Sequence, residues 1–175
     1  MHLYDDETRL RVDADQLSAL RVTDAAAFIA ARRRRQARLL GTRIAQHAAA
    51  PAIQLVSSEE GDAANLLLCL RDIVRPFPPN GVLVMVPAAN QLMVLPLVDL
   101  ASLGWMDVLV NAGHTAFRTA DRPFSTDLFW YDGSDFATFS QEMTEVGIRL
   151  DPPPGFRTAL RSLASRALRT VDAVA

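Results

Sequence analysis

The sequence predicts a single domain over residues 1–175 with an α/β fold of the α+β type, in which a small, mainly antiparallel sheet packs in two layers against several helices. Half of the residues are hydrophobic, which is enough for one buried core in a chain of this length. Two runs of β-forming residues, 82–86 and 91–95, are separated by only four residues, as in a β-hairpin. Apolar residues recur at three- and four-residue spacing over about 100–120, which is typical of a helix with one buried face.

The N-terminal part is expected to hold an arm, a long helix and a strand. Residues 1–22 mix acids, arginines and scattered apolar residues, so we expect a peripheral arm there. Thr23 is typical of a helix cap, so we expect a helix from there to about His47, stopped by Pro51. The run 52–56 then predicts a short strand.

The middle of the chain is expected to place a central hairpin between two helices. Asp62 is a candidate cap for a deeply buried helix over 63–74. The first hairpin strand, 82–86, is apolar on both faces, so we expect it in the centre of a sheet covered by helices. Asp99 is the candidate cap of the long helix that follows the hairpin.

The C-terminal part is expected to hold two strands and two helices. The aromatic run 126–131 predicts a strand that is closed by an Asp-Gly turn. Ser134 is a candidate cap for a short helix through Met143, and 146–150 predicts a final strand. Three prolines then introduce an amphipathic helix over 154–173.

The order of elements in the middle of the chain resembles the YtpQ-like proteins, a bacterial family without an established activity. The similar stretches are the strand VLVMV (82–86), the turn PAAN (87–90), the strand QLMVL (91–95) and the helix start LASLGW (100–105). The similarity extends at most over residues 23–132. It implies the α/β layout and transfers no functional residue to this chain.

The composition excludes several kinds of chemistry. All 18 basic residues are arginines, so Schiff-base lysines, P-loop lysines and lysine general bases are absent. The net charge of −2 gives no strong attraction to nucleic acid or anionic lipid. No cofactor fingerprint or metal-ligand spacing occurs, so we expect neither a cofactor nor a metal.

The location of the protein is expected to be the cytoplasm. The first residues are acidic, whereas a secretory signal begins with basic residues. No apolar stretch reaches the roughly 20 residues of a membrane span. The one cysteine, Cys69, lies in an apolar run and is expected to be a buried, inert core residue.

The arginines of the predicted N-terminal helix form the most conspicuous charged feature. Four consecutive residues span about 300° around a helix, so they cannot form one stripe. A solvated helix face is the favoured interpretation, and an anion site or a basic surface for nucleic acid, membrane or an acidic partner is the alternative. The four residues are Arg32, Arg33, Arg34 and Arg35.

Two further residues are weighed as candidates. His114 has no second ligand at helical spacing, so we expect a histidine at the surface or the edge of the core rather than a metal ligand or general base. Strand alternation places Trp130 on the opposite face from Phe129 and Tyr131. One of these faces is core, and the other is either covered as well or a surface for a partner.

The sequence leaves two classes of function open. We favour a non-catalytic bacterial cytoplasmic protein-interaction module (an adaptor, an immunity-type or a secretion-chaperone-like protein) that binds a protein partner or a second copy of itself. The alternative is a small hydrolase or transferase with a non-contiguous His/Asp/Arg site, using His114 and anchoring an anion with an arginine. The candidate binding residues are Arg32, Arg33, Arg34, Arg35, Arg122 and Trp130.

Overall fold

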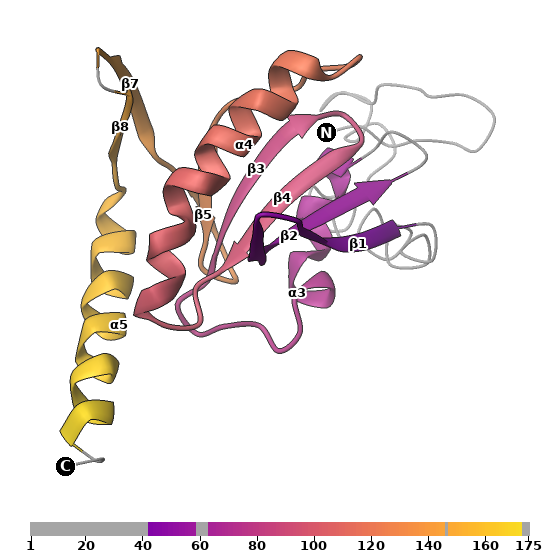
Figure 1. The fold of residues 1–175 in the computed structure, drawn as a ribbon. Helices are drawn as coiled ribbons and strands as arrows, with labels where there is room; N and C mark the ends of the chain where they lie inside the picture. The colour runs from indigo at the N-terminus through magenta and orange to yellow at the C-terminus, as the bar shows by residue number, and fades with distance from the viewer. Residues whose placement is uncertain (1–41, 59–62, 146, 173–175) are drawn as a thin grey trace, which may run out of the picture. The chain divides into compact units, whose positions relative to one another are not determined.

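The computed structural model describes residues 42–58, 63–145 and 147–172, which lie within one structural unit of the chain (Figure 1). The predicted arm over 1–22 and the predicted helix up to residue 41 lie outside the described residues. The expectation of one domain over 1–175 therefore stays a prediction.

The unit is built on a six-stranded antiparallel sheet with the strand order β1-β2-β4-β3-β5-β6. The strands are β1 (Thr42–His47), β2 (Ala50–Ser58), β3 (Val82–Ala88), β4 (Gln91–Pro96), β5 (Leu128–Tyr131) and β6 (Phe136–Thr138). The mixed fold with a mainly antiparallel sheet, predicted from the sequence, is confirmed.

The predicted hairpin forms the centre of this sheet. β3 and β4 are paired antiparallel, with Val84 opposite Val94, and all seven residues of β3 are buried. The strands extend further than expected, so that only Ala89 and Asn90 connect them. A strand that is apolar on both faces is stable only where both faces are covered, which explains the central position of β3.

Helical segments cover both faces of the sheet, so the two-layer arrangement we expected is too simple. On one face, the turn η3 (Leu100–Trp105) leads into helix α4 (Met106–Thr119), which contacts β3 and β4. On the other face, η2 (Ala63–Cys69) contacts β2, β3 and β4 and continues into α3 (Leu70–Ile73). The predicted buried helix over 63–74 thus consists of a 3-10 segment and one α-helical turn.

The predicted cap of the helix after the hairpin is confirmed, whereas Asp62, the candidate cap of the helix over 63–74, lies outside the described residues. The Asp99 side chain accepts hydrogen bonds from the backbone N–H of Ser102 at 2.9 Å and from its hydroxyl at 2.9 Å, which fixes the helix start. Gly113 lets α4 approach the sheet closely, because a Cβ atom there would touch the Met85 side chain. Cys69 is fully buried, as expected.

Two predicted helical stretches are strands instead. Residues 42–47, expected at the end of the N-terminal helix, form β1, because pairing with β2 across a tight turn satisfies their backbone groups. The expected helix from Ser134 to Met143 is also wrong. β6 pairs with β5, and Phe139 turns into the core, so tertiary packing decides the conformation of this segment.

The C-terminal region contains a separate two-stranded hairpin and a long helix. The hairpin consists of β7 (Ser140–Thr144) and β8 (Gly147–Asp151), and the helix α5 spans Pro154–Asp172 and follows directly from it (Figure 1). Phe156 and Leu163 of α5 are buried in the main core. The predicted last strand and the C-terminal helix are therefore confirmed.

Candidate functional site

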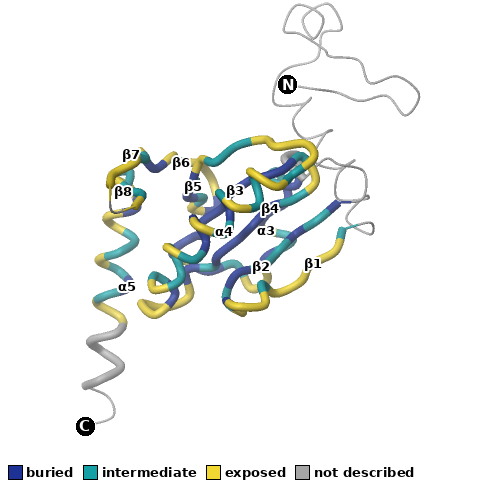
Figure 2. Tube along the Cα trace, turned by 45° about the horizontal axis from the view of Figure 1, so that its top comes forward, coloured by how far each residue is buried: buried dark blue, intermediate teal, exposed yellow. Residues whose placement is uncertain are grey.

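An open groove lies between α4 and the outer strands of the sheet. It has a volume of about 560 Å³. It exists because α4 covers β3 and β4, whereas β1, at the edge of the sheet, is exposed over most of its length (Figure 2). The residues on the sheet side are His47, Leu55, Gln91 and Met93.

One face of α4 forms the other wall. The residues that line it follow the i, i+3, i+4, i+7, i+8, i+11 spacing of a helix face: Val108, Asn111, Ala112, Thr115, Ala116 and Thr119. Eleven residues rise by about 16 Å, so the wall is three turns long. The sequence holds this spacing as a second pattern beside the buried stripe, so a signal for this wall is present in the sequence.

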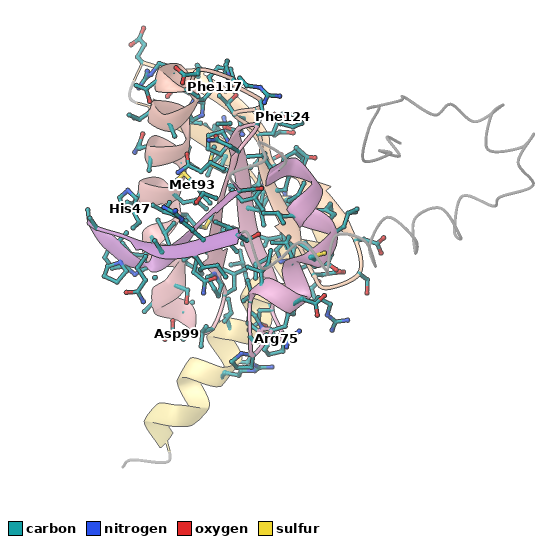
Figure 3. All side chains as sticks on the ribbon, turned by 90° about the vertical axis from the view of Figure 1, so that its right-hand side faces the viewer. His47, Arg75, Met93, Asp99, Phe117 and Phe124 are labelled. Atoms are coloured by element: carbon teal, nitrogen blue, oxygen red, sulfur yellow. The ribbon has the colours of Figure 1, made fainter. Side chains whose placement is uncertain are left out.

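The sheet side of the groove follows from strand register. Leu55 of β2 is paired with Met93 of β4, so both side chains point to the α4 face of the sheet. His47 lies at the end of β1, next to a register shift between Gln46 and His47, and lines the same groove as Met93 (Figure 3). Ala45, two residues earlier in β1, is paired with Leu55, so strand alternation places His47 on the same α4 face of the sheet.

The groove is more apolar than its residue types indicate. The Thr115 hydroxyl donates to the carbonyl of Asn111 at 2.8 Å, and the Thr119 hydroxyl donates to the carbonyl of Thr115 at 3.0 Å. Both hydroxyl protons are thus used on the helix backbone, and the methyl groups add apolar surface. In the described part of the chain, His47 Nδ1 is buried and has no hydrogen-bond partner.

The side chains that line the groove are uncharged apart from the titratable imidazole of His47. The described lining of the groove holds neither a carboxylate nor an arginine, and His47 is the one titratable side chain among these residues. An uncharged wall of small and apolar side chains is suited to burying apolar surface of another molecule. Proton transfer between an acid and a base has no pair of groups there to perform it.

His114 lies on another side of α4, half-buried. Its Nε2 is 3.3 Å from Oε1 of Gln141, whose amide nitrogen donates to the carbonyl of Thr126 at 3.0 Å. That second bond fixes the amide orientation, so Nε2 of His114 is the donor to Gln141. The expected position at the edge of the core is confirmed. Within the described residues, no group of three or more acidic, histidine or cysteine side chains is placed to hold a metal.

The remaining candidate residues do not line the groove. Trp130 is 8% exposed, its indole N–H donates to the carbonyl of Asn80 at 2.9 Å, and its ring centroid lies 5.7 Å from that of Phe156. The structure therefore places Trp130 in the core beside α5. Arg122 is exposed, and its backbone carbonyl accepts from Ala89 at 2.9 Å. Residues 32–35, the arginine cluster, lie outside the described residues.

Comparison with known proteins adds no assignment to these observations. No family model matches the chain, and no curated protein and no solved structure matches it. The resemblance to the YtpQ-like family stays a prediction. None of the helices in the described ranges has the length and the apolar character needed to cross a lipid bilayer.

Proposed function

We propose that this chain is a non-catalytic protein-interaction module that binds the apolar face of a protein partner in the groove beside α4. The single observation that carries the proposal is the lining of that groove: an uncharged helix face three turns long lies opposite Leu55 and Met93 of an incompletely covered sheet, with His47 and Gln91 beside them. The bacterial origin and the cytoplasmic location belong to the same proposal and rest on the sequence.

A helix is the partner element that suits this groove. Six strands at about 4.8 Å spacing make a sheet about 24 Å wide, whereas one helix covers about 10 Å of it. A second helix beside α4, at the usual 8–10 Å between axes, would lie over β1 and β2. Helix-in-groove binding buries an apolar face and needs no catalytic residue.

The alternative of a small hydrolase or transferase has less support. His114 donates its Nε2 proton to an amide, and the carboxylates of Glu142 and Glu145 are exposed on the β7–β8 hairpin. A catalytic base needs an acidic or nucleophilic partner within hydrogen-bond distance, and His114 has an amide there instead.

The experiment is capture of partners from native lysate with two matched variants. Thr115→Arg places a cation in the groove wall, whereas Thr158→Arg places the same side chain on the exposed side of α5. The proposal predicts that the captured proteins are lost with Thr115→Arg and retained with Thr158→Arg, while the melting temperatures of both variants stay near that of the wild type. Equal capture by both variants would overturn it.

A further inference from the structure

Helix α4 carries exposed charges of opposite sign near its two ends. Asp107 lies in its first turn and Arg118 in its last turn, and both side chains are exposed. Within the described residues neither takes part in an ion pair. They are eleven residues apart, about 16 Å along the helix, so they cannot pair with each other.

These two residues belong to one line along the helix surface. Asp107, Asn111, Thr115 and Arg118 follow each other at spacings of four, four and three residues, which places them along one side of α4. Asn111 and Thr115 also line the groove. Asp107 and Arg118 therefore lie at the two ends of the outer edge of the proposed binding surface.

From this arrangement we propose that the groove is filled by α4 of a second copy of the chain, with the two helices antiparallel about a two-fold axis. The inference rests on the proposed function, because it names the partner of the same groove. A two-fold axis midway along α4 brings Asp107 of each copy opposite Arg118 of the other, and Asn111 opposite Thr115. Both ion pairs form at once, because a two-fold interface repeats every contact.

Charge complementarity is the reason to prefer a second copy over an unrelated helix. The partner must carry a cation at one end and an anion at the other, three turns apart, beside an uncharged face. Helix α4 itself has this pattern. Antiparallel packing also places the positive end of each helix dipole next to the negative end of the other. The apolar contacts supply the affinity, and the two ion pairs set direction and register.

The test is sedimentation equilibrium of the full chain with exchanged charges. Asp107→Arg and Arg118→Asp each turn two attractive pairs into two repulsive ones, so each should raise the dimer dissociation constant by about tenfold or more. The double variant restores complementary charges across the axis and should return to within about threefold of the wild type. Glu145→Arg, the same charge change at an exposed position of the β7–β8 hairpin, should leave the dimer intact.

The outcomes separate this inference from the proposed function. A wild-type chain that is monomeric at every concentration up to about 1 mM would overturn the pairing. So would a dimer that neither single variant weakens, or one that the double variant fails to restore. The proposed function would survive these results if Thr115→Arg still removed a captured partner, and it would fail separately if capture did not depend on that residue.

Discussion

The anchoring of α5 by one aromatic side chain gives a sharp prediction about stability. Phe156 is 1% exposed, and its ring centroid lies 5.7 Å from that of Trp130 and 4.9 Å from that of Phe139, both in edge-to-face geometry. Replacing it with alanine removes a fully buried ring and two aromatic pairs. Buried Phe→Ala changes cost about 3–5 kcal/mol in unfolding free energy, because the cavity collapses only in part.

The assay is urea unfolding followed by tryptophan fluorescence. With a slope of about 2 kcal/mol per molar urea, the midpoint of Phe156→Ala should fall by about 1.5–2.5 M. Phe136→Ala is the matched control: this ring is 42% exposed and stacks on Tyr131 with centroids 4.4 Å apart, so its loss should cost about 1 kcal/mol. If both variants unfold at the same urea concentration, Phe156 does not hold α5 on the core.

Three further predictions concern single positions outside the groove, each measured as a change in unfolding free energy. Gly81→Ala should lower the unfolding free energy by about 1–3 kcal/mol, because φ is +79° and a Cβ atom there would overlap the carbonyl oxygen of Tyr131. A variant as stable as the wild type would show that this turn can relax. Asp99→Ala should lower the unfolding free energy by about 0.5–2 kcal/mol through loss of the capping box, and Asp99→Asn should keep most of that stability. An equal loss in both variants would mean that the charge of Asp99, and not its cap hydrogen bond, stabilises the helix start. Trp130→Phe should lower the unfolding free energy by about 1–3 kcal/mol, because the buried carbonyl of Asn80 loses its hydrogen-bond donor. An unchanged melting temperature would show that this hydrogen bond does not stabilise the fold.

The central part of the fold was predictable because local pattern and tertiary environment agree there. The runs 82–86 and 91–95 are strongly β-forming, and burial on both faces only reinforces that preference. The helix after Asp99 combines a cap with a regular apolar stripe, so local and long-range signals lead to the same element.

The edges of the sheet were not predictable in the same way. Residues 42–47 contain Thr42 and Ile44 among alanine, arginine and glutamine, a mixture that also suits a helix, and only pairing with β2 makes them a strand. The segment 134–143 has a good helix cap in Ser134, but Phe136 stacks on Tyr131 and Phe139 enters the core. Such long-range contacts leave no periodic signal in a short segment.

The candidate groove was missed for a related reason. Its walls come from four elements, and its position depends on which strands α4 leaves uncovered. Trp130 was singled out because tryptophan is common at interfaces, yet burial beside Phe156 decides its environment. Residue type alone cannot distinguish a core tryptophan from an interface tryptophan.

The most direct measurement of the central claim is photo-crosslinking with a benzoyl-phenylalanine residue placed at position 115, in the groove, or at position 158, on α5. The account predicts a covalent dimer of the chain from position 115, formed in native lysate and with the purified protein, and none from position 158. Crosslinking that is equal at both positions, or confined to position 158, would contradict the assignment of the α4 groove as the interaction surface.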